Sequence, residues 1–324
     1  MEEKIDLTAT GRDAAARLDV FMAKHLGLGR SHAARLIEQG HVLVDGTRKR
    51  PSFKLKAGMR VQGAWEKQEE IQELTAAEIP LDILYEDPWI VVINKPAGMT
   101  VHPGAGTTGD TLVNALLARY PEIGAVGDPG RPGIVHRLDK LTSGVMIVAR
   151  NTEAHAVLST AFKAHEHRRE YLAVCYGCMP QKSGTIETFM QRNPKDRKRM
   201  TSRSGEGRRA ITHWEVLIEW KEFSLLRLTL GTGRTHQIRV HLSDAGHPVA
   251  GDPVYGGRRR VNAVADTRIR AHVKGLGRQM LHAAVLGIRH PGTGEFIEFM
   301  CDMPEDMKTF MAVLDKFDVP SLTP

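Results

Sequence analysis

An acidic stretch with few apolar residues divides the sequence into two unequal parts. Residues 66–80 (EKQEEIQELTAAEIP) carry five acidic side chains and one basic side chain, and they end in a proline. Such a segment cannot bury enough apolar surface to join a core, so we expect a solvated linker there. The chain of 324 residues is therefore predicted to form two domains, 1–75 and 76–324, rather than one large core.

The composition favours ordinary globular domains and argues against several other classes of protein. Hydrophobic residues make up 41% of the chain and charged residues 26%, which is typical of a packed, soluble fold. Three cysteines are too few for a disulfide framework, and the N-terminus lacks the apolar core of a signal peptide. We therefore expect a cytoplasmic protein. No apolar stretch approaches the roughly 20 residues of a membrane helix, so we do not expect a membrane protein. The net charge of +7 favours a polyanionic partner.

The first part of the sequence is predicted to be a small basic domain of helices followed by a hairpin. Residues 1–65 carry 12 basic and 7 acidic side chains. Ser31 as N-cap and Gly40 just past the end predict a short helix over 31–39. The alternating residues 42–44, which precede an Asp-Gly turn, predict a strand that opens a hairpin.

The order of residues in this part resembles the S4 domain, an RNA-binding module of ribosome-associated proteins. The resemblance covers residues 17 to about 61, from RLDVFMAKHL to KLKAGMRV. Arg30 and Arg35 lie at opposite ends of about one and a half helical turns, and further basic residues follow in the hairpin. An isolated run of charge is usually a solvated surface, but in this order the arginines are predicted to contact RNA phosphates.

The second part shows paired strands without a regular alternation of strand and helix. Helices are predicted from near Thr111 and over 152–166 with Thr152 as N-cap, and the strands at 82–86, 89–95, Tyr171 to Tyr176, Ile211 to Trp220 and Phe223 to Leu230. This order favours an α+β architecture with a mixed, largely antiparallel sheet over a doubly wound parallel sheet. The basic stretch 192–209 is predicted to be a loop that contacts phosphates.

Two segments of this part are rich in reactive polar side chains, and each is a turn between apolar runs. The first, GIVHRLDKLTSGVMIVAR at 133–150, would hold the carboxylate of Asp139 rigidly between strands. In the second, LGTGRTHQIRVHLSDAGHPVAGDPVYGG at 230–257, Thr235 can cap a helix whose first turns carry His236, Gln237 and Arg239. Arg234 precedes that helix, so two arginines and a helix N-terminus would point toward one place.

Four ordered motifs resemble those of the RluA family of pseudouridine synthases. They are HRLDKLTSG at 136–144, NKPAGMTVHP at 94–103, RREYLAV at 168–174, and GRTHQIRVH at 233–241 with GHPVAGDPVYG at 246–256. The resemblance spans about residues 83–300 and implies isomerisation of uridine in RNA. In that reaction the bond from C1′ to N1 breaks, the base turns, and C1′ joins C5 without net hydrolysis or redox change.

The resemblance also implies roles for individual residues. Asp139 would be the nucleophile, adding either to the base or to C1′. Arg234 is our first choice for the arginine that pairs with Asp139, and Arg239 is the second. Tyr171 would stack on the target base and relay a proton at C5.

Further side chains are predicted to bind the substrate. Arg137 would fill the space vacated by the flipped base or hold the RNA backbone, because a stacked base cannot reach a buried carboxylate. His136, His236 and Arg239 complete the set in the second part, with Arg30 and Arg35 in the first.

No metal, phosphate-loop or dinucleotide motif stands in the sequence, so we expect no cofactor and no metal site. The resemblance, which extends to the segments VHPGAG and DPVYGGR, implies large-subunit ribosomal RNA as partner, with the stem-loop helix 69 as target. We expect a monomer, because no feature of the sequence indicates a dimer. Three alternatives remain: a sister synthase acting on another rRNA or tRNA site, a non-catalytic rRNA assembly factor, and a hydrolase that releases uracil.

Overall fold

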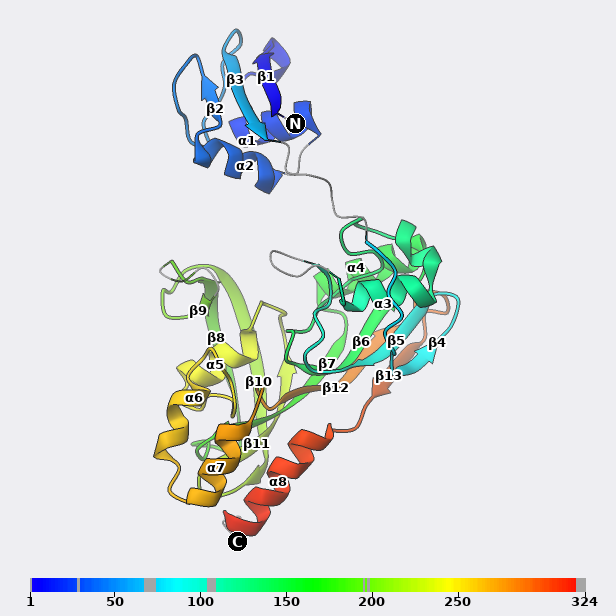
Figure 1. Ribbon diagram of the computed structural model, residues 1–324, viewed down its shortest axis with the longest axis vertical. Helices are drawn as coiled ribbons and strands as arrows, with labels where there is room; N and C mark the ends of the chain where they lie inside the picture. The colour runs from blue at the N-terminus through cyan, green and yellow to red at the C-terminus, as the bar shows by residue number, and fades with distance from the viewer. Residues whose placement is uncertain are drawn as a thin grey trace. The chain divides into compact units, whose positions relative to one another are not determined.

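The computed structural model of the chain describes residues 2–27, 30–66, 74–103, 109–194, 196 and 199–318. Contacts divide the chain into Met1–Glu73 and Leu74–Pro324, called here the small unit and the large unit (Figure 1). Residues 67–73 of the expected linker lie outside the described part. At its far end Thr75, Ala76, Glu78 and Pro80 are exposed, while Leu74 packs against the core of the large unit and the Thr75 carbonyl accepts a hydrogen bond from Asn114 Nδ2 at 2.6 Å.

The small unit is a three-stranded sheet covered by two helices. Its elements are β1 (Glu2–Thr8), α1 (Leu18–Leu26), α2 (Arg30–Gln39), β2 (Val42–Val44) and β3 (Arg60–Glu66). The strands pair antiparallel in the order β1-β3-β2, and the helices bury Phe21 and Ile37 against them. The predicted helix and strands are confirmed, but α2 begins at Arg30, so Ser31 is not its N-cap. Gly40 follows α2 with a φ of 84°, as expected at that position.

The large unit is built on a ten-stranded sheet. Its strands are β4 (Ile83–Glu86), β5 (Ile90–Lys95), β6 (Ser143–Ala149), β7 (Arg168–Tyr176), β8 (Ser183–Arg192), β9 (Met200–Thr201), β10 (Arg208–Glu219), β11 (Phe223–Leu230), β12 (Leu281–Arg289) and β13 (Phe296–Met300). Its helices are α3 (Leu112–Arg119), α4 (Thr152–Ala164), α5 (Gln237–Asp244), α6 (Gly257–Arg260), α7 (Thr267–Gly275) and α8 (Glu305–Phe317).

The strand order confirms the predicted α+β fold with a mixed sheet. It runs β4-β5-β6-β12-β7-β11-β10-β8-β9, with β13 paired to β12. Among the described strand pairs, β12 with β6 is parallel and the others are antiparallel. Gly144 permits that parallel pair, since a Cβ there would lie 2.1 Å from the carbonyl oxygen of Ala283 and its φ is 121°.

Helices cover both faces of the sheet, and successive side chains of β7 point alternately into the two cores that the helices close. Tyr171, Ala173 and Cys175 point into a core that includes residues of α3 and α5. Val174 and Tyr176 point into the opposite core, which α7 and α8 close. Figure 1 shows α5, α6 and α7 beside the β8–β11 end of the sheet and α3 and α4 beside the β4–β6 end. The functional residues lie on the face of Tyr171.

The other expected elements are largely confirmed, with two corrections. The predicted helices and strands correspond to α3, α4, β4, β5, β7, β10 and β11. Asn151, not Thr152, caps α4, because its side chain accepts a hydrogen bond from the amide of Ala154. The stretch 192–209 is not only a loop: β9 lies within it and β10 begins in it. Across the described ranges, no helix is both long and apolar enough to cross a membrane.

Candidate active site

Asp139 stands in the short connection that leads into β6. The preceding Leu138 is buried, and the amide of Thr142 donates to the Asp139 carbonyl at 3.0 Å, so the turn is closed on itself. The Asp139 side chain is 18% exposed and lines an open cavity of about 110 Å³. The turn therefore holds Asp139 in place, as expected from the sequence, and the structure leaves its side chain accessible to a ligand.

Arg239, in the first turn of α5, is the arginine that pairs with Asp139. Its Nη1 donates to Asp139 Oδ2 at 2.9 Å, and its side chain is only 5% exposed. The first choice from the sequence, Arg234, is wrong for this contact: its Nε donates to the carbonyl of Arg209 at 3.1 Å. The cause is local, because Arg234 precedes α5 in a turn, where its amide donates to the Gln237 side chain at 3.0 Å.

A second carboxylate, which the sequence analysis did not identify, holds Arg239 in place. Asp252 is fully buried and accepts from Arg239 Nε at 2.7 Å and from Nη2 at 3.0 Å. The amides of Val254 and Tyr255 also donate to Asp252 Oδ1, at 2.8 and 3.0 Å. Burial lowers the pKa of the Arg239 guanidinium, but the hydrogen bonds and charge of Asp252, and then of Asp139, outweigh burial and raise that pKa above its usual value.

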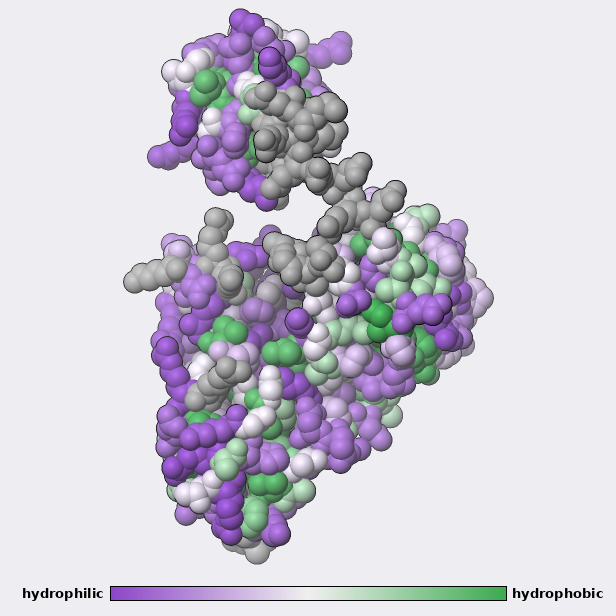
Figure 2. Space-filling view, viewed as in Figure 1, coloured by the Kyte–Doolittle hydropathy of each residue, from purple (hydrophilic) through white to green (hydrophobic). Residues whose placement is uncertain are grey.

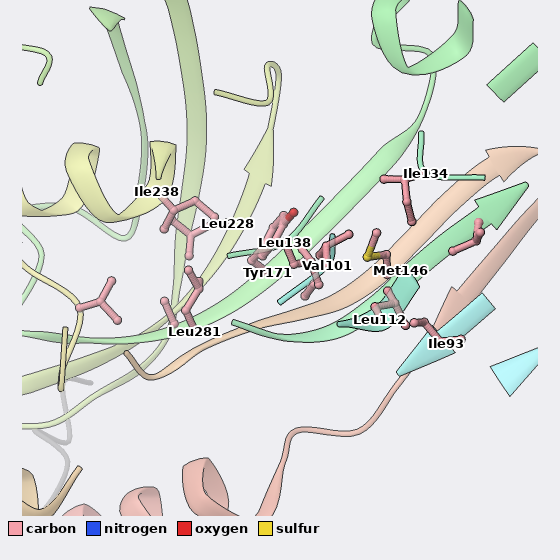
Figure 3. Close-up of a cluster of buried hydrophobic side chains, with 14 of the residues drawn as sticks. Ile93, Val101, Leu112, Ile134, Leu138, Met146, Tyr171, Leu228, Ile238 and Leu281 are labelled. Carbon is pink, nitrogen blue, oxygen red and sulfur yellow. The ribbon is translucent and has the colours of Figure 1, made fainter. Parts of the chain in front are cut away.

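Tyr171 forms part of the wall of the same cavity. It lies on β7 between Leu228 of β11 and Ala283 of β12. Figure 3 shows its ring beside Leu138, with Leu281 close by, and Leu138 and Leu281 also line the cavity. Burial raises the pKa of the Tyr171 phenol, so this group keeps its proton at neutral pH. The cavity thus joins an apolar wall to a phenol, a carboxylate and a guanidinium.

Arg169 is another cavity residue that the sequence analysis passed over. It precedes Tyr171 by two residues on β7, so both side chains leave the strand on the same face. Its guanidinium lies close to Gly233, where a Cβ would be 2.8 Å from Nη1. Its Nε is buried without a hydrogen-bond partner among the described residues.

Lys95, in the NKPAG motif, lies beneath the connection that carries Asp139. It is fully buried, and its Nζ donates to the carbonyls of Pro96 at 2.7 Å, Met99 at 3.0 Å and Lys140 at 3.4 Å. Burial lowers the pKa of its ammonium group to about 7, although the charge of Asp139 opposes this effect. Lys95 therefore fastens the loop after β5 to the residue next to Asp139.

The two predicted substrate-binding histidines have different surroundings. His236 lines the cavity as the N-cap of α5, with a φ of 57°, and its Nε2 lies 3.8 Å from Asp139 Oδ1. His136 does not line the cavity: its Nε2 accepts from the amide of Ile147 at 3.1 Å, and its ring stacks on Phe162. This ring packs α4 against β6, and its role in substrate binding stays a prediction.

The predicted arginines occupy separate regions. Arg137 is exposed and lines the cavity that holds Asp139. Arg30 belongs to the small unit, where its Nε donates to Asp19 at 3.2 Å, and Arg35 lies on the same helix. The cavity thus gathers Arg137, Asp139, Tyr171, Arg234, His236 and Arg239. Throughout the described ranges, no group of three or more His, Cys, Asp or Glu side chains could hold a metal ion.

Comparison with known proteins places this geometry in a family. The family model for RNA pseudouridylate synthase matches residues 89–244, and that for the S4 domain matches residues 16–61. Ribosomal large subunit pseudouridine synthase D of Xanthomonas campestris is 41% identical over 304 residues, covering 93% of this chain and 89% of the relative. The uncharacterized RNA pseudouridine synthase YlyB of Bacillus subtilis is 38% identical over 314 residues, covering 97% and 99%.

A solved structure gives the same result. The human RNA pseudouridylate synthase domain containing 1 matches with a TM-score of 0.55 and 25% identity, over 77% of this chain and 98% of that one. The motifs, the mixed sheet and full-length relatives therefore agree. The chain belongs to the RNA pseudouridine synthases, a family of isomerases, and carries an S4 domain ahead of its catalytic unit.

Proposed function

We propose that this enzyme converts uridines of large-subunit ribosomal RNA to pseudouridine, in the stem-loop helix 69, with Asp139 as nucleophile. The observation that carries the proposal is the Asp139 carboxylate, which Arg239 holds at 2.9 Å in an open cavity with one apolar wall. The relatives named ribosomal large subunit pseudouridine synthase D support the choice of ribosomal RNA.

The side chains of the cavity suit an isomerisation. The glycosidic bond from N1 to C1′ breaks, a bond from C5 to C1′ forms, C5 loses a proton, and N1 ends with one. Asp139 supplies the electron pair that starts the reaction, and its exposed edge is compatible with attack on the base or on C1′. Arg239 stabilises the carboxylate charge in both routes.

Tyr171 and Arg137 have separate tasks in this proposal. The Tyr171 ring offers a face for the flipped uracil, and its protonated phenol can accept or return a proton at C5 only by exchange with a neighbour or water. Arg137 stands exposed at the same cavity, where it fills the gap in the RNA stack or contacts a phosphate. The apolar Leu138 and Leu281 exclude water from the base.

The decisive test is position-resolved mapping of pseudouridine in large-subunit rRNA from a deletion strain. Loss of pseudouridine in helix 69, restored by the wild-type gene, supports the proposal. Loss of pseudouridine at another site would support the proposed reaction but overturn helix 69 as the target. An unchanged map together with RNA binding would indicate the assembly factor instead.

Purified protein separates isomerisation from hydrolysis. Asp139→Asn has nearly the same size, so folding and RNA affinity should stay close to wild type while turnover is lost, since an amide cannot act as the anionic nucleophile. More than a trace of pseudouridine from this variant would overturn the assignment of Asp139. Free uracil from the wild-type enzyme would instead identify a hydrolase.

A further inference from the structure

Tyr255 is a buried residue that touches three parts of the site without lining the cavity itself. It lies between α5 and α6 and is 6% exposed. Its hydroxyl lies 2.7 Å from Nδ1 of His236 and accepts a hydrogen bond from the amide of Met200, on β9, at 2.9 Å. Its own amide donates to Asp252.

The hydrogen bonds of this hydroxyl decide which nitrogen of His236 carries the proton. A phenol has one proton to donate, and the Met200 amide already occupies an acceptor position on the Tyr255 oxygen. No other acceptor for the Tyr255 hydroxyl is recorded among the described residues, so its proton goes to Nδ1 of His236. Nδ1 is then unprotonated, and the neutral imidazole carries its proton on Nε2.

The protonated Nε2 is the atom that faces the catalytic carboxylate. It lies 3.8 Å from Asp139 Oδ1, while Arg239 holds Oδ2 at 2.9 Å, so the two oxygens meet different donors. The groups that act on the His236 ring are Asp139, Arg239, Asp252 and Arg137. Burial lowers the pKa of His236, although Asp139 opposes this, so the ring is neutral at neutral pH.

The ring of Tyr255 also contacts two guanidinium groups. The Arg239 Cζ lies 5.0 Å from the ring centroid and the Arg199 Cζ lies 5.4 Å from it, both within the range of a cation–π contact. Arg199 belongs to the basic stretch around β9, and Figure 2 shows mostly hydrophilic residues on the side of the large unit that carries α5 and α6. Tyr255 therefore connects that stretch to both groups that face Asp139.

We propose that Tyr255 is a positioning residue, which fixes His236 in the Nε2–H form with that N–H directed at Asp139 Oδ1. The proposal rests on the function proposed above for Asp139. Tyr255 does not touch the reacting atoms and acts through the histidine. At 3.8 Å the Nε2–H acts as an oriented dipole, which keeps the carboxylate turned so that one oxygen stays with Arg239 and the other is open to the substrate.

The first test reads the histidine directly and needs no activity. In a ¹⁵N-histidine-labelled wild-type enzyme, the His236 signals are assigned by their absence from His236→Asn. Asparagine is suited to this position because it tolerates the left-handed conformation of residue 236. We expect the Nε2–H form in wild type and a mixture of the two neutral forms in Tyr255→Phe. A wild-type spectrum with the proton on Nδ1 overturns the proposal.

The second test measures single-turnover rates and RNA affinity of the same variants. Tyr255→Phe keeps the ring over Arg239 but loses the hydroxyl, so we expect the rate to fall about 10- to 100-fold, with RNA affinity nearly unchanged. The matched control is Tyr176→Phe, because Tyr176 is equally buried on β7 and its hydroxyl has no hydrogen-bond partner among the described residues. That control should retain the wild-type rate.

The double variant with His236→Asn completes the test. If Tyr255 acts through His236, the double variant should be no slower than His236→Asn alone. The proposal would be overturned if the rate losses of the two single variants multiplied in the double variant, or if Tyr255→Phe kept the wild-type rate. A wild-type enzyme that makes no pseudouridine would overturn the proposed function instead, and the NMR spectrum would still decide the state of His236.

Discussion

Each unit of the chain holds a cluster of arginine and aspartate side chains, but the two clusters differ in their exposure to water. In the small unit, Asp19 is buried and accepts from Arg17 and Arg30, whose side chains are 42% and 60% exposed. In the large unit, the arginine itself is buried: Arg239 is 5% exposed and is shared by two carboxylates.

This difference distinguishes the ion pairs of Asp19, which have a structural role, from those of Arg239, which hold a carboxylate at the cavity. Around Asp19 the charges are screened by water, and the carboxylate lies in the first turn of α1, where the helix dipole also stabilises it. Arg239 itself is almost wholly buried, so its charge acts more strongly on its two carboxylate partners. The second carboxylate, Asp252, keeps the guanidinium in place, which leaves Asp139 partly open to a ligand.

The largest expected effect is on stability, when each cluster loses its buried carboxylate. Asp252→Ala leaves the buried charge of Arg239 with one partner, so the free energy of unfolding of the large unit should fall by about 3–5 kcal/mol. Asp19→Ala leaves two arginines that water can reach, so the small unit should lose about 1 kcal/mol or less. Hydrogen exchange read by mass spectrometry in rising denaturant reports each unit separately.

A control variant separates lost charge from lost hydrogen bonds in this comparison. Asp252→Asn keeps an acceptor for the amides of Val254 and Tyr255 while it removes the charge. Its cost should fall between those of wild type and Asp252→Ala. Equal costs for Asp19→Ala and Asp252→Ala would show that burial of the arginine does not distinguish the two clusters.

The next effect concerns the phenol beside the buried cluster. Tyr171→Phe keeps the aromatic ring in the cavity and with it the surface on which a base can stack. If the phenol relays a proton, the isomerisation step should slow by about 100-fold, with little change in RNA affinity. Single-turnover measurement of pseudouridine formation checks this, and an unchanged rate would reduce Tyr171 to a stacking surface.

The ordered motifs predicted most of the residues that line the cavity. The residues that they did not predict depend on where α5 begins and on which face of β7 a side chain lies. The identity of Arg239 as the partner of Asp139 depends on where α5 begins. The sequence placed the cap at Thr235, whereas His236 takes that position in a left-handed conformation. Arg169 could have been predicted, because two-residue alternation along β7 puts it on the face of Tyr171.

Other features depend on contacts between residues distant in sequence. The strand β1 contains few apolar residues, and it forms because β3 pairs with it along its whole length. Asp252 gives only a weak signal in sequence, an acid before a proline, and its role appears once a buried arginine needs a second partner. The role of Tyr255 depends on contacts that only the fold brings together, since its hydroxyl bonds to Met200 of β9 and to His236, the N-cap of α5.

A smaller effect should appear in the pH dependence of stability. His241 is fully buried between the hydroxyls of Thr188 and Thr212, and burial lowers its pKa to about 4. Between pH 6.5 and 4 the unfolded chain binds a proton that the folded chain does not, so the large unit loses stability as the pH falls.

The pH dependence that His241 contributes corresponds to the binding of one proton on unfolding. His241→Gln should flatten the slope by roughly 1.4 kcal/mol per pH unit within that window and leave it unchanged above pH 6.5. Denaturant unfolding of wild type and variant at several pH values gives both slopes. Parallel slopes would show that His241 is protonated in the folded enzyme.

Removal of the small unit should have the least effect on catalysis itself. The residues Asp139, Tyr171 and Arg239 all lie within 74–324, so this fragment should keep the rate at saturating RNA. The small unit still offers Arg48, Lys49 and Arg50, which lie between β2 and β3, for contact with phosphates. The fragment should therefore need more RNA for half-saturation and show a weaker dependence on salt.

The salt dependence measures how many phosphates the small unit contacts. Each lost contact lowers the slope of log affinity against log salt concentration by about 0.7 to 0.9, so three contacts would lower it by roughly 2 to 3. A fragment with full affinity and the same slope would show that the small unit does not touch RNA in the productive complex. A folded fragment without activity would show that the division between binding and chemistry is incomplete, because the small unit would then help to build the active site.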